Sequence, residues 1–368
     1  MPTRRQFIQS ATAIAGGTVG LGACSSESDD ESYEMAERRT WRGNDGRVIE
    51  RSALQRELVR YATLAPSSHN TQCWKFRLDA RAITILPDLS RRCPAVDPDN
   101  HHLFVSLGCA AENLIQAAMA NGLNGQAQVA GVATGGLRIA LEATAAFASP
   151  LFLAIPERQC TRAEFDALPL SAVELKLLEQ AGTGHGVRVI LLTAKTAMEK
   201  ILEYVVEGNT AQMNDRAFVE ELKTWIRFGR AEAVRTGDGL FSGSSGNPSI
   251  PRWLGIPAFS MLFTPKSENE KYTKQIRSSA GLAIFVSGAN DHAHWIETGR
   301  CYERFALQSA ALGIRNAMIN QPVEVSALRP QFASFLGIGN ARPDLVVRFG
   351  RGPLMPRSLR RPVDAVLA

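Results

Sequence analysis

Two segments far apart in the chain share one pattern: Gly108–Leu123 reads GCAAENLIQAAMANGL, and Gly299–Ile314 reads GRCYERFALQSAALGI. In each, a glutamate follows the first glycine by four residues and a second glycine follows it by fourteen. Both are alanine-rich patterns typical of helices, and the closing glycine suits the left-handed residue that ends many helices. Because small side chains let two helices approach closely, we expect both segments at the centre of the fold. Such a repeat indicates a duplicated unit.

The similarity extends upstream of both segments. Each half of the chain starts with two arginines four residues apart and continues with a serine that has a glutamine or glutamate three residues after it: Arg38, Arg42, Ser52 and Gln55 first, then Arg158, Arg162, Ser171 and Glu174. Such a serine predicts a capping box at a helix N-terminus. An amphipathic helix and a strand are expected to follow in each half, with an apolar strand closing it at 151–156 and 344–350. Coincidence is the alternative, and three matching features in the same order argue against it.

The sequence therefore predicts an α+β fold of two related halves, residues 36–156 and 157–368, with mixed or antiparallel sheets and packed helices. The stretch between the first strand and the glycine-bounded helix is much longer in the second half. Its additional residues, at about 195–280, contain an amphipathic helix pattern and a glycine-rich loop. Long insertions often form lids or binding loops, although a helical excursion on the surface fits the same pattern.

Residues 1–35 have the pattern of an export signal and spacer, outside the fold. Arg4 and Arg5 precede a short apolar run rich in glycine and alanine, as in twin-arginine signals. The run is shorter than the roughly 20 apolar residues that cross a membrane. It ends in Leu-Gly-Ala-Cys24, which resembles a lipobox and precedes a charged, serine-rich spacer. We expect an exported, periplasmic or extracytoplasmic protein with lipid on Cys24, and a soluble signal peptide with an incidental cysteine is the alternative.

Composition describes an ordinary globular protein, with 45% hydrophobic residues, 21% charged residues and a net charge of +5. Six arginines gather between Arg342 and Arg361, but no DNA- or RNA-binding motif accompanies them, so nucleic-acid binding is not predicted. Apart from Cys24, five irregularly spaced cysteines form neither a disulfide framework nor a zinc pair. The adjacent His101 and His102 would point to different faces of a helix, which argues against a metal site.

The most polar junction of the first half is APSSHNTQCW, at 65–74, between a helix pattern and a strand. The second half has GTGHG at the matching place. The first segment resembles the A-P-S-S-x-N-x-Q-P-W motif of the nitroreductase superfamily, with Cys73 where proline is usual. The C-terminal PDLVVRFGRGPLMPRSLRRPVDAVL resembles the ending of that family. With its export signal and duplicated halves, the chain resembles the Acg-like branch, in which one chain imitates the nitroreductase homodimer as a pseudo-dimer.

This resemblance implies a bound FMN between the two halves. Four residues of the loop would contact the flavin ring: Pro66, Ser67, Ser68 and Asn70. Four arginines would bind the phosphate: Arg158, Arg162, Arg360 and Arg361. Asn320 and Gln321 would lie beside the ring. Because only the first half has the ring loop, one FMN per chain is expected, and Arg38 and Arg42 would be relics of the duplication or face solvent.

The chemistry of these residues agrees with a flavin site. A flavin needs fixed donors and acceptors at its pyrimidine edge, which hydroxyl, amide and backbone groups supply. Arginine forks suit a phosphate dianion. His69 is a further site candidate, with a solvent-facing histidine as the alternative, and Trp225 and Phe228 could cover the flavin or pack in the core. A plain turn remains the alternative for the whole loop.

We therefore expect an FMN-binding, nitroreductase-like oxidoreductase that acts on a nitroaromatic or quinone-type acceptor. A flavin-binding or sequestering protein, with its substrate face closed by the insertion, is the alternative. No catalytic residue is assigned, because the flavin carries the hydride chemistry. A fused pseudo-dimer predicts a monomer whose partners are FMN, a small-molecule electron acceptor and a membrane.

Overall fold

The computed structural model describes residues 25–43, 50–129 and 136–368, and the side chains among them from residue 32 onward. The first described element is helix α1 (Ser25–Thr40). The expected twin-arginine signal and Cys24 lie outside the described residues, so both stay predictions.

The first sheet follows helix α2 (Arg51–Thr63). Its strand order is β1-β2-β4-β3, and every neighbouring pair is antiparallel. The strands are β1 (Trp74–Asp79), β2 (Ala82–Pro87), β3 (Leu123–Val129) and β4 (Leu137–Ala143). Helix α3 (His101–Ala120) runs between β2 and β3 and is buried over most of its length. Buried and less buried positions alternate along β1, as in a sheet with one face in the core.

The second sheet repeats this arrangement after helix α5 (Ala172–Ala181). Its order is β5-β8-β10-β9, again antiparallel throughout. The strands are β5 (Val187–Leu192), β8 (Gly281–Ser287), β9 (Arg315–Met318) and β10 (Arg342–Gly350). Helix α11 (His292–Ala311) has the place in this half that α3 has in the first. The expected α+β class with antiparallel sheets is confirmed, and the strand order is the same in both halves.

Helices α3 and α11 cross in direct contact at the centre of the molecule. A Cβ on Gly108 would lie 2.0 Å from the carbonyl oxygen of Ile296, and one on Gly299 would lie 1.9 Å from that of Val105. Glycine is required at both positions, because the two backbones touch where the helices cross. By length and composition α3 could cross a membrane, but 78% of its apolar stretch is buried inside the fold, as expected of a core helix.

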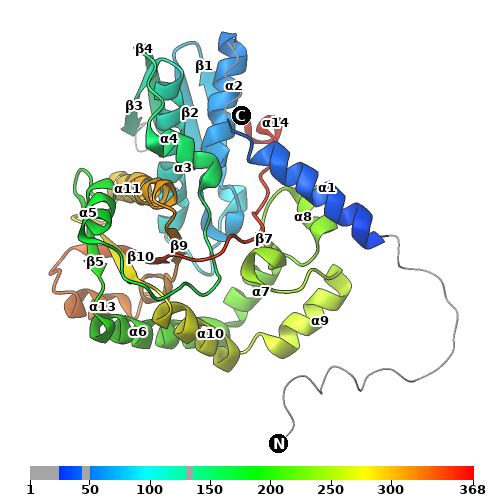
Figure 1. Ribbon diagram of the computed structural model, residues 1–368, viewed down its shortest axis with the longest axis vertical. Coiled ribbons are helices and arrows are strands. Elements are labelled where there is room, and N and C mark those ends of the chain that lie inside the picture. Colours follow the sequence, from blue (N-terminus) through cyan, green and yellow to red (C-terminus); the bar gives the residue numbers. More distant parts are fainter. Residues whose placement is uncertain (1–24, 44–49, 130–135) are drawn as a thin grey trace, which may run out of the picture.

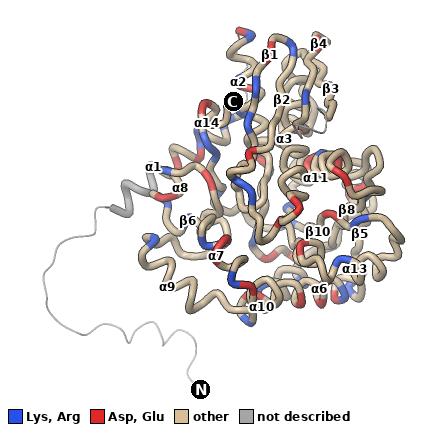
Figure 2. Tube along the Cα trace, turned by 180° about the vertical axis from the view of Figure 1, so that it is seen from behind, with Lys and Arg blue, Asp and Glu red and all other residues tan. Residues whose placement is uncertain are grey.

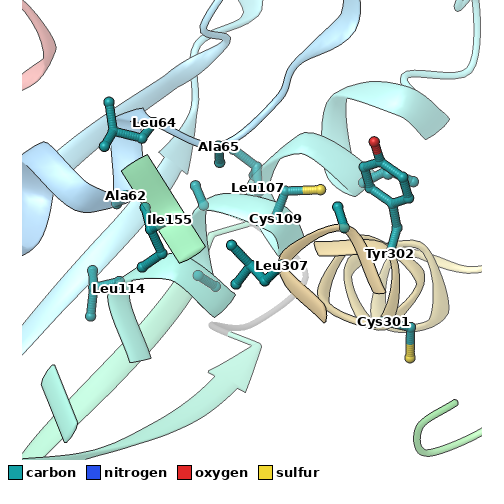
Figure 3. Packing of buried hydrophobic residues seen from close by; sticks show 14 of the residues in the cluster. Ala62, Leu64, Ala65, Leu107, Cys109, Leu114, Ile155, Cys301, Tyr302 and Leu307 are labelled. Atoms are coloured by element: carbon teal, nitrogen blue, oxygen red, sulfur yellow. The ribbon is translucent and has the colours of Figure 1, made fainter. Parts of the chain in front are cut away.

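A single apolar core spans both halves. Figure 3 shows Leu107 of α3 and Leu307 of α11 within it. The C-terminal tail then links the second half back to the first. Its short helix α14 (Val363–Val366) contacts α2, and the N–H of Ala368 donates to the carbonyl of Phe76 in β1 at 2.9 Å. The two halves are therefore interlocked.

The prediction of a strand at 151–156 is wrong. Helix α4 (Pro150–Ala154) covers most of that segment. Its start is fixed by Ser149, whose hydroxyl accepts the N–H of Phe152, and by the proline in its first turn, whose φ suits a helix.

Predictions about helix ends are partly right. The capping box that begins at Ser171 is present. The glycines that follow the two central helices have left-handed φ angles, +76° at Gly122 and +69° at Gly313, as expected. Ser52 forms no capping box, because α2 begins at the residue before it and has Glu50 as its N-cap residue.

The insertion leaves and re-enters the second sheet between β5 and β8, which pair directly with each other. It consists of α6 (Lys195–Asn214), α7 (Arg216–Trp225), β6 (Ile226–Arg227), α8 (Arg230–Thr236), β7 (Leu240–Phe241), α9 (Arg252–Leu262) and α10 (Pro265–Arg277). In Figure 1, α6 and α10 lie along the lower edge of the molecule, and α9 and α8 lie on its right-hand side. Asp238 ties the insertion to the first half, since its carboxylate contacts both Arg227, at 2.7 Å, and Arg91. The helices α12 (Gln321–Glu324) and α13 (Arg329–Phe335) lie between β9 and β10.

Candidate functional site

A cavity of about 480 Å³ lies where the two halves, the insertion and the C-terminal tail meet. That volume is in the range of small-molecule sites. The first half contributes the loop at 66–70 and part of α3, the second half contributes 158–162 and 317–324, and the tail contributes 356–360. About half of the lining residues belong to the insertion. The cavity therefore exists only when all four parts are folded together.

The loop between α2 and β1 has an unusual backbone. The angle φ is positive at His69 (49°), Asn70 (53°) and Gln72 (53°), although none of them is glycine. Such conformations cost on the order of 1–3 kcal/mol each and concentrate at functional sites. Specific bonds hold them here: the Ser67 hydroxyl accepts the N–H of Gln72 at 2.9 Å, and the Gln72 side chain donates to the carbonyl of Gly237 at 2.8 Å and accepts a backbone N–H of the tail.

The side chain of Asn70 joins the loop to the insertion and to the tail. Its Nδ2 donates to the carbonyl oxygens of Gly239, at 2.9 Å, and Leu359, at 3.1 Å. Only 6% of the residue is exposed, and its Oδ1 is buried without a hydrogen-bond partner among the described residues. An unsatisfied buried acceptor costs about 1–3 kcal/mol. Asn70 thus lines the cavity and has a buried acceptor that no described group satisfies.

Two other residues that line the cavity also have buried polar atoms without a partner among the described residues. Gln321 begins α12, is 6% exposed, and has no hydrogen-bond partner for its Oε1 among the described residues. Helix α6 backs it closely, because a Cβ on Gly208 would lie 2.8 Å from the Cβ of Gln321. Ser244 of the insertion also lines the cavity, and its buried hydroxyl has no hydrogen-bond partner among the described residues. Loop, α12 and insertion therefore each offer one hydrogen-bonding group.

One end of the cavity holds two cationic side chains, Arg162 and Lys271, and one carboxylate, that of Glu268, which lies 3.9 Å from the Lys271 ammonium. The guanidinium of Arg162 lines this end and makes no hydrogen bond or ion pair with any described residue. Burial lowers the pKa of Lys271, and the charge of Arg162 acts in the same direction. Burial together with the charge of Arg162 lowers the pKa of His69 to about 4. Burial likewise lowers the pKa of Arg348 to about 9, again with a contribution from Arg162. A bound anion would relieve this repulsion.

Two further arginines line the cavity but are largely engaged by protein groups. Arg158 lies 3.2 Å from a carboxylate oxygen of Glu303 and donates to the carbonyl of Leu64 at 2.7 Å. Burial raises the pKa of Glu303 to about 7, although Arg158 opposes this. Arg360 donates to the carbonyls of three residues at the end of α2 and to two in the tail: Thr63, Leu64, Ala65, Ser358 and Leu359. Burial, with Arg158 nearby, lowers the pKa of Arg360 to about 9.

The structure brings most of the predicted binding residues to this one cavity: Pro66, Ser67, Ser68, Asn70, Arg158, Arg162, Gln321 and Arg360. Arg361 does not line it, and its guanidinium donates to the carbonyl of Ala365 at 2.6 Å. His69 lines the cavity with a buried, unpartnered Nδ1, so the solvent-facing alternative is wrong within the described chain. Phe228 lines the cavity, whereas Trp225 packs beneath two arginine side chains.

The remaining predicted residues lie as follows. Asn320 lines the cavity, and its Oδ1 accepts the N–H of Val346 at 2.9 Å. Arg38 is exposed and pairs with Glu34, while Arg42 pairs with Glu57. Neither of these arginines lines the cavity, which agrees with the expectation that they face solvent.

Several cavity residues were not predicted. Lys271 and Tyr272 come from α10, a helix whose charged pattern resembles any surface helix. Burial raises the pKa of Tyr272 to about 12, so its hydroxyl stays protonated and can donate. Ser244 lies in the glycine-rich loop that marks the insertion in the sequence, and that loop was the one signal available for it.

Known proteins that resemble this chain include two named as nitroreductases. No family model matches the chain. Two curated relatives, from two strains of Mycobacterium tuberculosis and both named "Putative NAD(P)H nitroreductase", are 24% identical over 330 residues, covering 85% of this chain and 90% of theirs. They support the nitroreductase superfamily.

Two of the solved structures that resemble this chain in part are FMN proteins. A nitroreductase with bound FMN from Bacteroides fragilis is 14% identical, covers 56% of this chain and 89% of its own, and has a TM-score of 0.35. The FMN-dependent nitroreductase NfnB from Mycobacterium smegmatis, in complex with NADPH, is 12% identical. The match covers 54% of this chain and 86% of NfnB, with a TM-score of 0.36.

Proposed function

We propose that this protein is an FMN-dependent oxidoreductase of the nitroreductase type, acting on a nitroaromatic or quinone-type acceptor. The observation that carries the proposal is the cavity wall, where the unpartnered Oδ1 of Asn70 and Oε1 of Gln321 share one cavity with the free guanidinium of Arg162. The names of the two curated relatives support it.

The residues present fit FMN. A flavin has an imide N–H and carbonyl oxygens at one edge, and a buried amide oxygen such as that of Asn70 is a suitable acceptor for the N–H. The phosphate of FMN suits the end where Arg162 and Lys271 line the cavity together. Arg158 and Arg360 would contribute positive charge near the phosphate but few hydrogen bonds to it, because protein groups already accept most of their N–H donors. Arg361 would support the loop through its backbone.

FMN, when bound, supplies hydride transfer between a reductant and an acceptor. The protein's part is to bind, orient and shield. Asn70 fixes the loop against the insertion, so the ring-binding groups keep their positions. The insertion covers the cavity with apolar side chains such as Phe228 and Phe259, which exclude water. His69 stays neutral near pH 7, because its pKa is about 4, and its Nδ1 can hold or accept a hydrogen bond.

The finer assignments are also part of this proposal. The chain is a fused pseudo-dimer of the Acg-like branch, with its halves at 36–156 and 157–368 and with a lid at about 195–280, and it works as a monomer with one FMN. The shared strand order and the α3–α11 crossing support the duplication. Export by the twin-arginine route and lipid on Cys24 rest on the sequence alone.

The first experiment is the visible spectrum of residues 25–368, purified without added flavin and then mixed with excess NADPH under anaerobic conditions. A flavin band that bleaches with NADPH supports a nitroreductase-type enzyme. A band that persists until dithionite is added favours a sequestering protein or a different electron donor. Absence of any flavin, with no uptake of added FMN, would reject the proposal.

A further inference from the structure

Helix α9 of the insertion is apolar on its outer face as well as its inner one. Trp253 is 72% exposed, Met261 77% and Leu262 72%, and Leu254 and Ile256 are exposed too. Single exposed apolar residues are ordinary, but a contiguous group of this kind marks an interaction surface. We call these five residues the α9 face.

The inner side of α9 is seated on the fold. Gly255 packs against Phe228, since a Cβ there would lie 2.3 Å from that ring. Ala258 and Phe259 line the cavity, and Leu262 does so while remaining largely exposed. The same helix therefore forms a wall of the cavity and an apolar outer surface, and Leu262 lies at the boundary between them.

Few charged residues belong to the segment that contains α9, and one of them, Arg252, pairs with Glu232 of α8 at 2.9 Å. From residue 239 to residue 267 the chain contains no aspartate or glutamate and only two charged side chains, Arg252 and Lys266. In Figure 2 the α9 segment is drawn almost wholly in the colour of uncharged residues. An apolar face with a tryptophan and flanking basic residues is the composition of helices that lie in a membrane interface.

The first described helix, α1, lies on the same side. Helix α1 begins at Ser25, the residue after Cys24, and it contacts α8 of the insertion. Figures 1 and 2, seen from opposite directions, both place α1, α8 and α9 along one side of the molecule. A lipid on Cys24 would therefore hold this side, and with it the α9 face, against a bilayer.

We propose that α9 docks in the surface of a lipid bilayer, so that an apolar redox partner dissolved in the membrane, of the quinone class, reaches the cavity beside Leu262. The docking rests on the α9 face and on the position of α1 on the same side, whereas the identity of the redox partner rests on the proposed flavin function. A second copy of the chain is the weaker occupant. A helix of 11 residues is only about 16 Å long and about 10 Å wide, far less than the roughly 800 Å² per partner of a standard protein interface.

The docking test uses residues 25–368, which lack the lipid anchor, and vesicles of phosphatidylglycerol and phosphatidylethanolamine in a flotation assay. The double variant Trp253→Ser/Met261→Ser removes two apolar side chains that do not line the cavity. The matched control is Phe147→Ser/Leu153→Ser, two side chains each 62% exposed outside the insertion. We expect vesicle binding by the wild type and the control, and about tenfold weaker partitioning of the α9 variant.

Tryptophan fluorescence gives an independent reading. Trp253 is the exposed one of the five tryptophans, because Trp41, Trp74 and Trp295 are buried and Trp225 is half-buried. Vesicles should shift the emission of the wild type to the blue and leave that of Trp253→Ser unshifted. Absence of vesicle binding, or equal binding by the α9 variant and the wild type, overturns the docking. A concentration-dependent dimer that only the α9 variant loses would overturn it in favour of a second copy.

The redox part has its own test. The reduced flavin of the wild type should be reoxidised faster by a long-chain quinone in vesicles than that of the α9 variant, while a short, water-soluble quinone reoxidises both equally. Equal rates with the long-chain quinone overturn the membrane route for the acceptor. If the protein binds no flavin at all, the proposed function fails while vesicle docking can still be scored.

Discussion

The side chain of Arg162 decides how its end of the cavity works. Its guanidinium lines the cavity without engaging any described residue, whereas that of Arg361 lies outside and donates to Ala365. If Arg162 binds the phosphate as proposed, Arg162→Gln removes a charge-assisted hydrogen bond worth about 1.5–3 kcal/mol. The Kd for FMN should therefore rise roughly 10- to 150-fold. The measurement is quenching of FMN fluorescence as apo-protein is titrated into it.

Two matched comparisons make this result specific. Arg361→Gln should change the Kd for FMN by less than about twofold, and riboflavin, which lacks the phosphate, should bind equally to the wild type and to Arg162→Gln. Thermal unfolding of both variants checks that the fold is retained. An unchanged Kd in Arg162→Gln together with a large loss in Arg361→Gln would refute this reasoning and return the phosphate to the C-terminal tail.

Three further predictions concern the frame of the site. Gly299→Ala puts a Cβ 1.9 Å from the carbonyl oxygen of Val105 and should lower the free energy of unfolding by about 3 kcal/mol or more. The control Gly43→Ala, whose Cβ meets nothing within 4 Å, should leave the free energy of unfolding nearly unchanged. Equal denaturant midpoints for the two variants would contradict this. Asn70→Ala removes the side-chain donor to the carbonyl of Gly239, while that of Leu359 keeps the guanidinium of Arg360. It should cost about 1–3 kcal/mol and weaken FMN binding, and a variant as stable and as tight as the wild type would contradict it. Burial raises the pKa of Glu303 to about 7 from an ordinary 4.5, so the native state binds this proton more tightly than the unfolded state does. The resulting stability, at most about 3 kcal/mol, is present at acid pH and is lost as the pH rises to about 7. The free energy of unfolding of Glu303→Gln should therefore increase relative to that of the wild type over this pH range, and a constant difference would rule this out.

The parts of the fold that could be predicted are those carried by local pattern. The glycine-bounded helices α3 and α11 were predicted together with their central position, because the small residues that allow the crossing are visible in the sequence. The strand order within each sheet was not predicted, since pairing joins residues far apart in the chain. The helix at Pro150 was missed although its signal was present: a serine followed by proline is a common helix start, and the apolar run after it was interpreted as a strand.

The candidate site, like the fold, could be predicted only in part. The loop residues were predicted from a contiguous motif, and Asn70 lies where that motif implies, at the cavity wall. Which arginines are free could not be predicted, because it depends on carbonyls and carboxylates from other elements. Arg360 is occupied by the end of α2, and Arg158 by Glu303, whereas Arg162 is not engaged by any described residue. The lining from α10 was equally invisible, since a surface helix and a cavity wall share one charged pattern.

The direct pairing of β5 with β8 has a consequence for the order of folding. The first sheet begins with a hairpin that closes across residues 80–81, whereas β5 and β8 can pair only after residues 193–280 have been looped out. Closing the longer loop costs about 3 kcal/mol more in chain entropy. Pairing at long sequence separation is also slow, so the first sheet should acquire protected amides before the second during refolding. A cavity that needs the insertion and the tail in place would then be the last part of the protein to form.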